Sequence, residues 1–348
     1  MKKKVISLLM TGVLAIGILT GCGDSTPSKN ADSDTVSTEE KGELVVLRDA
    51  VMTGQLDQYA TEIGKWQGIF EKYGIDLQTT EFVAGINTID SVVTGTADIG
   101  MMADYAAVNR LGNTLNATDL QIFSQLSGGT TAASGGLYVA PKYVDDLTAL
   151  DGSEGFLYQE GTVTYYYTGK VLEYLGLNEA DQKLINTDSS QTRLALIEKG
   201  EASAAYASGA EAKYYEEAGW QLVATSEELG IITGSYFLAP ESYIEENTEL
   251  LSNFLLAVNE STDYINNHID ECAEYLEGKL GVKAEDFKAS WANYSFSKGF
   301  SEAAATHLED IEAWAFAHGS FQQEYNIRDF INTSVVEKAF PENVTIEK

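Results

Sequence analysis

Residues 135–143 read GGLYVAPKY and residues 234–243 read GSYFLAPESY. Each stretch is a glycine, a short apolar run with a tyrosine and the pair Ala-Pro. Together they hold two of the four prolines of the chain, Pro141 and Pro240. A strand ends at proline because proline has no N–H to continue the ladder. The two stretches therefore predict two short strands that end in the same way.

Strands and helices alternate on both sides of the first stretch, as judged from apolar runs and from apolar residues at helical spacing. The expected strands cover 43–51, 75–82, 97–102 and 120–126 in a first unit and 154–161, 181–188, 201–209 and 220–226 in a second. The expected helices cover 64–74, 87–95, 104–112, 162–176, 189–200 and 210–219, and after Pro240 the chain is almost wholly helical. This alternation is typical of an α/β fold with parallel sheets.

The two stretches lie at the borders of the second unit. If the chain leaves the first lobe through 136–140 and returns through 235–239, the second unit is an insertion and the two crossing strands lie side by side as a hinge. The alternative is a pair of unrelated edge strands with similar spelling. The insertion predicts one lobe built from 43–136 and 237–348 and another built from 137–236.

The first 42 residues have the marks of export. Residues 1–21 contain three lysines, an apolar stretch and small residues, which is typical of a signal peptide and not of a membrane span. The end of this segment and the next residue, Cys22, read Leu-Thr-Gly-Cys, which is similar to a bacterial lipobox. In such signals the cysteine is lipidated and anchors the protein; an ordinary signal peptide is the alternative. Residues 22–42 are polar and lack aromatic side chains, so we expect a disordered tether.

Composition limits the partners. The chain has 53 acidic residues against 22 lysines and arginines, a formal net charge of −31, which disfavours nucleic acid and anionic lipid surfaces. Hydrophobic residues make up 44% of the chain, as in a globular protein, and the roughly 300 residues after the tether suit two domains. Cys272 has no partner once Cys22 is lipidated, so we expect a buried, inert thiol and no disulfide framework.

Several short sequence segments are similar to those of a known protein family. They include GIFEKYGIDL at 68–77, SVVTGTADIG at 91–100 and LALIEKGEASAAY at 194–206. In order and spacing the chain resembles the substrate-binding lipoproteins of ABC importers, in the nitrate, sulfonate, taurine and thiamine-precursor branch. Two departures lie near the expected cleft. No lysine follows the glycine in DDLTALDGSEGFLY, and residues 101–105 stand where a glycine or proline is common.

The resemblance implies an α/β protein with the two-lobed type II periplasmic-binding fold, two crossing strands as its hinge and a helical C-terminal region. It implies a small-molecule ligand that the lobes close around, and ABC permease and ATPase subunits as partners. We expect a monomer at the outer face of the bacterial cytoplasmic membrane, held there by the lipid on Cys22.

Ligands of open α/β sheets bind beyond the carboxyl ends of strands, where helix N-termini point. Applied to the expected strands of both lobes, this rule selects a set of candidate ligand-binding residues. They are Arg48, Asp49, Met52, Thr53, Gln55, Gly85, Asn87, Met102, Asp104, Tyr105, Gly161, Thr162, Thr164, Tyr206 and Ser208.

Two candidates have ordinary structural alternatives. Thr162 stands at the start of an expected helix, where it serves equally well as an N-cap. Arg48 has Asp49 and Asp104 as candidate ion-pair partners.

Catalytic and metal signatures are missing. The chain has no Cys-x-x-Cys, no His-Glu-x-x-His, no Gly-x-Ser-x-Gly and no phosphate loop. The three histidines, His268, His307 and His318, all fall in the C-terminal helical region. Pyrimidine-synthesising enzymes that resemble this protein and share its fold depend on an active-site histidine and lysine. We therefore expect a binding protein without cofactor or metal, and not an enzyme.

The residues leave the ligand open. Helix N-termini with Arg48 suit a sulfonate or another small anion, whereas Asp49 and Asp104 with tyrosine and methionine suit an amine or an aromatic ring. The resemblance favours a sulfonate or taurine-like ligand. The alternatives are an aminopyrimidine or other nitrogen heterocycle, or a sensor lipoprotein without a transport role.

Overall fold

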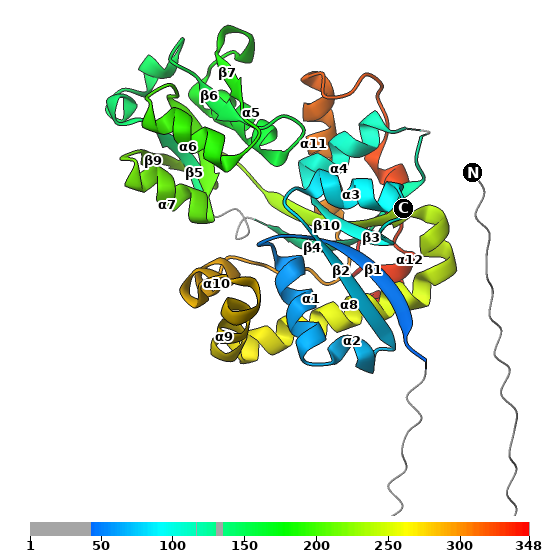
Figure 1. The fold of residues 1–348 in the computed structure, drawn as a ribbon. Helices are drawn as coiled ribbons and strands as arrows, with labels where there is room; N and C mark the ends of the chain where they lie inside the picture. The colour runs from blue at the N-terminus through cyan, green and yellow to red at the C-terminus, as the bar shows by residue number, and fades with distance from the viewer. Residues whose placement is uncertain (1–42, 116, 130–134, 348) are drawn as a thin grey trace, which may run out of the picture. The chain divides into compact units, whose positions relative to one another are not determined.

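The computed structural model describes residues 43–115, 117–129 and 135–347 (Figure 1). The helices and strands named below all belong to one compact unit, Gly42–Lys348. The expected signal peptide, tether and Cys22 lie outside the described residues. Within the described part of the chain, no helix is long and apolar enough to cross a membrane.

Sheet A has five strands in the order β2-β1-β3-β10-β4. They are β1 (Val45–Met52), β2 (Ile75–Phe82), β3 (Ile99–Ala103), β4 (Leu120–Gly129) and β10 (Thr233–Pro240). β1 pairs in parallel with β2 and β3, whereas β10 runs antiparallel between β3 and β4. The predicted strands of the first unit are confirmed, and the sheet is parallel except for β10.

Sheet B also has five strands, in the order β7-β6-β8-β5-β9. They are β5 (Gly135–Val139), β6 (Phe156–Tyr158), β7 (Leu184–Asn186), β8 (Ala204–Ser208) and β9 (Gln221–Thr225). β6 pairs in parallel with β7 and β8, and β5 runs antiparallel between β8 and β9. The predicted strands of the second unit are also confirmed.

The two stretches quoted at the outset form the same strand of each sheet. In both sheets the order is second, first and third strand of the unit, then an antiparallel strand, then the fourth. That antiparallel strand is β5 in sheet B and β10 in sheet A. Both have a register shift in their ladder, between Leu137 and Tyr138 in β5 and between Ser235 and Tyr236 in β10. The two similar sequences therefore form strands at equivalent interior positions of the two sheets, and the edge-strand alternative is wrong.

The prediction that residues 136–140 and 235–239 lie side by side is also wrong. β5 bonds to β8 and β9, and β10 bonds to β3 and β4, so each strand has both of its edges occupied within its own sheet. The change of sheet falls between Gly129 and Gly135 and between Thr225 and Thr233, outside the two strands. A proline shows where a strand ends but not which sheet the strand joins.

The helices are confirmed with one correction. The predicted helix over 64–74 is two helices, because Gly68 takes a φ of +67° between α1 and α2. The helices of the first part are α1 (Leu56–Trp66), α2 (Ile69–Lys72), α3 (Gly85–Val93) and α4 (Asp104–Asn113). Those of the second are α5 (Val163–Leu175), α6 (Ser190–Glu198) and α7 (Gly209–Glu217).

The region after Pro240 is helical, as expected. It contains α8 (Glu241–Asn267), α9 (Ile269–Leu280), α10 (Ala284–Trp291), α11 (Glu302–Ala317) and α12 (Ser334–Ala339). Figure 1 shows α1, α2 and α8 on one side of sheet A, and α3, α4 and α11 on the other. Cys272 lies buried in α9 as a free thiol, and burial raises its pKa to about 12.

Gly136 is a point of very close packing in β5. A Cβ atom built on Gly136 would lie 2.1 Å from the carbonyl oxygen of Ala224 on the neighbouring strand β9. That oxygen belongs to the backbone of the ladder, so it cannot move away without disturbing the pairing of β5 with β9.

We expect Gly136→Ala to lower the free energy of unfolding by about 1–3 kcal/mol, as overpacked sites do. Gly278 in α9 is the matched control, because a Cβ built there meets no atom within 4 Å. Gly278→Ala should leave stability unchanged or raise it by up to about 1 kcal/mol, the helix-propensity difference. Urea unfolding of the two variants checks this, and equal effects would contradict the close packing of β5.

Candidate functional site

The carboxyl ends of the parallel strands define the candidate site in both lobes. We call the part of the protein built around sheet A lobe 1 and the part built around sheet B lobe 2. In lobe 1 the order β2-β1-β3 reverses at β1, and in lobe 2 the order β7-β6-β8 reverses at β6. The second strand of each unit lies on one side of the first strand and the third strand lies on the other. The loops after the first and third strands therefore lead in opposite directions and leave a crevice between them, and in open α/β sheets ligands bind in this crevice.

Three candidates of lobe 1 come together at this edge. Met52 is the last residue of β1, Gly85 the first of α3, and Met102 lies near the end of β3. A Cβ atom built on Gly85 would lie 3.3 Å from the sulfur of Met52 and 3.4 Å from the Cα of Met102. The small residue thus lets the start of α3 approach the ends of both strands. Met102 itself is fully buried.

Three further candidates lie on the loops and helix starts of the same edge. Thr53 is exposed, and its backbone N–H donates to the carbonyl of Phe82 at the end of β2. Gln55 is the N-cap of α1 and makes no side-chain cap hydrogen bond. Asn87 is exposed in the first turn of α3. These positions agree with the carboxyl-end rule.

The position predicted for Arg48 is wrong. It lies inside β1 and not after it, and its guanidinium pairs with Asp98, which directly precedes β3. A further hydrogen bond of 2.8 Å joins Arg48 Nη1 to the carbonyl oxygen of Gly95. Both partners lie at the amino end of β3, the edge opposite the candidate site. Arg48 is therefore removed from the site, and neither of its expected partners is the one observed.

Asp49 is also not open to a ligand. It is 1% exposed, and neither carboxylate oxygen has a hydrogen-bond partner. Burial and the neighbouring Asp57 carboxyl raise its pKa well above the ordinary aspartate value, and Lys65 opposes this. Asp57, fully buried in the first turn of α1, accepts a 2.8 Å bond from the N–H of Met52. Burial raises its pKa to about 7 despite that bond.

The buried Asp49 carboxyl makes stability fall as pH rises. The unfolded chain releases this proton above about pH 4, while the folded chain keeps it up to the raised pKa. Above pH 4 unfolding is therefore increasingly favoured. We expect Asp49→Asn to make this downward slope shallower above pH 4, by at most about 1.4 kcal/mol per pH unit, the effect of one proton. Asp145→Asn, at an exposed position, is the control in urea unfolding at several pH values. A slope equal to that of the parent would show that Asp49 is ionised in the folded chain.

Asp104 joins three elements at the end of β3. Its Oδ1 accepts from the N–H of Tyr105, and its Oδ2 accepts from the N–H of Gly234 at 2.7 Å. His307 Nε2, from α11, lies 2.8 Å from the same Oδ2. Asp104 is fully buried, so it holds α4, β10 and α11 together and does not face the crevice. Sequence reasoning missed His307, because it lies 203 residues from Asp104 in the chain.

The two candidate tyrosines are packed and hydrogen-bonded within the protein. Tyr105 is 1% exposed and its hydroxyl lies 2.9 Å from that of Ser320. The Tyr206 hydroxyl lies 2.9 Å from that of Ser226. The Tyr206 ring lies 4.4 Å from the ring of Tyr167, measured between centroids. We assign both candidates to the packing around the lobe junction and not to an open ligand surface.

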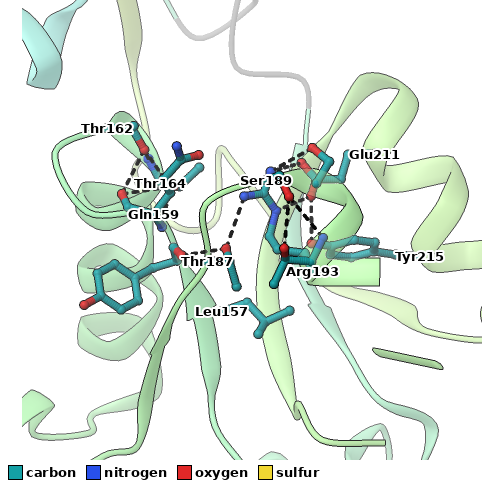
Figure 2. Close-up of polar contacts among 12 residues, drawn as sticks. Leu157, Gln159, Thr162, Thr164, Thr187, Ser189, Arg193, Glu211 and Tyr215 are labelled. Atoms are coloured by element: carbon teal, nitrogen blue, oxygen red, sulfur yellow. Dashed lines mark hydrogen bonds and ion pairs between the residues drawn. The ribbon is translucent and has the colours of Figure 1, made fainter. Parts of the chain in front are cut away.

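In lobe 2 the predicted turn before α5 is well formed (Figure 2). Thr162 is the N-cap of α5, and its Oγ1 accepts from the N–H of Thr164 at 3.3 Å. The Thr164 hydroxyl in turn accepts from the N–H of Gln159 at 2.9 Å. The N-cap alternative for Thr162 is confirmed. Gly161 borders a cavity, and Ser208 is exposed at the end of β8.

A cavity of about 450 Å³ opens beside this turn. The loop after β6, the end of β7 with the loop that follows it, and the start of α6 line it, with the residues Gln159, Glu160, Asn186, Thr187, Asp188 and Thr192. None of these residues was among the candidates. Their signal was present in the sequence, since polar residues follow the expected strands at 154–161 and 181–188.

Arg193 follows the lining residue Thr192 in α6, and its charge is paired with a carboxylate (Figure 2). Its guanidinium makes two hydrogen bonds to the Glu211 carboxylate, of 2.5 and 3.2 Å. The side chain also donates to the hydroxyls of Thr187 and Ser190, while the Tyr215 hydroxyl donates to Glu211. This ion pair joins α6 to α7 and leaves little charge for an anionic ligand.

A second cavity of about 210 Å³ joins the two lobes. Gly161 borders it from lobe 2, and lobe 1 contributes Ile86, Ala106, Asn109, Arg110, Asn113 and Thr114. Arg110 makes a 2.7 Å ion pair with Asp90, but its Nε is buried and has no hydrogen-bond partner.

No group of three or more histidine, cysteine, aspartate or glutamate residues in the described part of the chain is arranged to hold a metal ion.

Comparison of the sequence with protein families gives one family. The profile of the family described as NMT1/THI5 like matches residues 63–272, more than half of the chain. This stretch runs from α1 to α9 and includes the loops that border both cavities. No curated protein sequence matches the chain.

Three solved structures have a similar fold. The aliphatic sulphonate-binding protein SsuA of Escherichia coli has a TM-score of 0.70 at 17% identity, over 82% of this chain and 97% of that one. SsuA of Xanthomonas axonopodis pv. citri, an alkanesulfonate-binding protein bound to MOPS, has 0.69 at 16%, over 84% and 99%. The nitrate-binding protein NrtA of Synechocystis PCC 6803 has 0.64 at 14%, over 86% and 89%. The expected two-lobed α/β fold of type II periplasmic binding proteins is thereby confirmed.

Proposed function

Because the chain belongs to the NMT1/THI5-like family, we propose that it is the extracytoplasmic substrate-binding component of an ABC importer. The observations that carry this proposal are the pair of similar sheets and a cavity shared by both lobes, which is bordered by the turn after β6 in lobe 2 and by residues of α3 and α4 in lobe 1. A small molecule there contacts both lobes only when they are closed, so it favours the closed form.

The ligand we propose for this site is a small sulfonate or taurine-like molecule. The similar structures include proteins named for sulfonate and nitrate binding, and the starts of α5 and α6 offer backbone N–H groups beside the larger cavity. A nitrogen heterocycle such as an aminopyrimidine is the second candidate, favoured by the two carboxylates that line this cavity.

Several parts of the proposal follow from the proposed role in import. The partners are a permease and an ATPase, the acylated Cys22 holds the protein at the outer face of the membrane, and the protein acts as a monomer. It binds its substrate without chemical change.

A ligand screen tests the proposed function. We expect thermal stabilisation of the chain from residue 43 by one member of a panel of taurine, alkanesulfonates, nitrate and aminopyrimidines. A ligand at 100 times its Kd adds about 2.7 kcal/mol to the free energy of unfolding, several degrees in Tm. A flat response across the panel would contradict both ligand classes.

The lobes touch at a second place, beside the junction. The indole N–H of Trp314 in α11 donates to Glu173 in α5 at 3.0 Å. A Cβ built on Gly169 of α5 would lie 2.1 Å from the Trp314 ring. Across the opposite side, Lys213 of α7 makes a 2.8 Å ion pair with Asp286 of α10. The glycine thus allows α5 to approach α11 closely enough for the lobes to pack.

We expect Gly169→Ala to move the lobes apart, because the added methyl group overlaps the Trp314 ring. The radius of gyration from small-angle scattering should increase, and ligand affinity should fall. Gly278→Ala, remote from the lobe contact, is the control. An unchanged radius and affinity would show that the tryptophan moves aside without cost to closure.

A further inference from the structure

His318 lies at the contact between the lobes. It is the C-cap of α11, and its ring stacks on that of Trp314 one turn earlier, with ring centroids 3.9 Å apart and planes at 17°. Trp314 is the residue that packs against Gly169 and donates to Glu173, both in α5 of lobe 2. The histidine therefore extends the contact between α11 and lobe 2.

Both ring nitrogens of His318 lie near acceptors. Nδ1 lies 2.8 Å from the carbonyl oxygen of Trp314, which can only accept a hydrogen bond. Nδ1 therefore holds the proton when the ring is neutral, and Nε2 then has a lone pair and no hydrogen. Nε2 lies 3.6 Å from Oε2 of Glu179, across the lobe contact. Only the imidazolium, with both nitrogens protonated, is attracted to this carboxylate.

Glu179 is held in position by its own lobe. It begins the short helix η4 (Glu179–Asp181) after α5, and the Tyr165 hydroxyl donates to its Oε1 at 2.9 Å. The other carboxylate oxygen, Oε2, is the one that lies near His318. The side chains of His318 and Glu179 are 29% and 28% exposed, so solvent screens their interaction only in part.

Other titratable groups surround this pair. Burial raises the pKa values of Tyr105, Tyr158 and Tyr165, so their hydroxyls stay neutral near pH 7. The charged groups are Glu173 with its partner Lys170 in α5, Glu160 before α5 and Asp310 in α11. Among all of these side-chain types, histidine is the one whose charge ordinarily changes between pH 5 and pH 8.

Two groups within lobe 1 can change charge in the same range. Burial raises the pKa of Asp57 to about 7, and His307 lies beside Asp104. Neither group is a partner of His318, so variants of His318 separate its contribution from theirs.

His268 has the same local geometry without the carboxylate. It is the C-cap of α8, its Nδ1 lies 3.0 Å from the carbonyl oxygen of Tyr264, and its ring stacks on that of Tyr264 with centroids 4.3 Å apart. Over the described ranges, the ion pairs of histidine are those of His307 and His318. The stacking and the carbonyl contact thus occur at both helix ends, whereas the carboxylate partner is particular to the lobe contact.

We propose that His318 and Glu179 form a proton-dependent latch between the lobes. The imidazolium stabilises the lobe contact by its charge pair with Glu179 and by stacking as a cation on the Trp314 indole. Loss of the proton as pH rises removes the charge pair, so the lobes separate more readily. The latch itself needs no ligand. Its consequence rests on the proposed function: a smaller closed fraction raises the apparent Kd of a ligand held between the lobes by the same factor.

Hydrogen exchange of the Trp314 indole N–H, followed by NMR without added ligand, tests the latch. This N–H donates to Glu173 across the lobe contact. The indole N–H of Trp291, which donates to Asn266 within lobe 1 at 2.8 Å, is the internal reference. We expect the protection of Trp314 relative to Trp291 to be about two- to fivefold greater at pH 5.5 than at pH 7.5, the effect of one partly exposed ion pair.

Variants assign the effect to the two partners. His318→Gln and Glu179→Gln each remove one charge and should abolish the increase in protection at pH 5.5. His268→Gln removes the histidine of matched geometry and should retain the increase, and the Tm of each variant checks folding. An increase of the parent's size in His318→Gln or in Glu179→Gln would overturn the latch, and so would equal protection of the parent protein at both pH values.

Failure of the latch is distinguishable from failure of the proposed function, because exchange is measured without a ligand. Exchange that is insensitive to pH overturns the latch and leaves the binding-protein function to the ligand panel. Exchange that changes as expected confirms the latch even if every ligand of the panel fails to bind.

Discussion

The pairing of β10 with β3 and β4 is the constraint on which the rest of the structure depends. The chain builds sheet B, then returns to place β10 in the interior of sheet A, bonded on both edges. Asp104 binds the N–H of Gly234 at the start of that strand and also contacts His307. One buried carboxylate therefore ties the returning strand and α11 to the carboxyl end of β3.

The repeat of β5 and β10 gives the two lobes a common plan. Each sheet has its antiparallel strand in the same place, so each presents the ends of its first and third strands toward a similar crevice. Charge then distinguishes the two sides. The cavity of lobe 2 is lined by carboxylates, and the cavity shared with lobe 1 has an arginine. Under the proposed function, a small molecule binds between these two sides.

Much of the architecture was predictable from local pattern, and the site only in part. The parallel strands were found, and Met52, Thr53, Gln55, Gly85, Asn87 and Gly161 lie at or beside their carboxyl ends; that these residues contact a ligand stays a prediction. Arg48 and Asp49 do not lie there. Successive side chains of a strand point to opposite faces of the sheet, so neighbouring residues lie in different environments. The sequence pattern does not show which residues they contact there. Arg48 pairs with Asp98, whereas Asp49 is buried near Asp57.

The sequence by itself determined the alternation of strands and helices, the ends of the strands before Pro141 and Pro240, and the family, because these depend on contacts between near neighbours and on local motifs. Only the tertiary structure decided that the two similar stretches belong to different sheets, that His307 meets Asp104 and that Arg110 borders a cavity with Gly161. The physical reason is that strand partners and the residues that line a cavity are determined by packing between segments far apart in the chain. The spacing of residues along the sequence does not predict that packing.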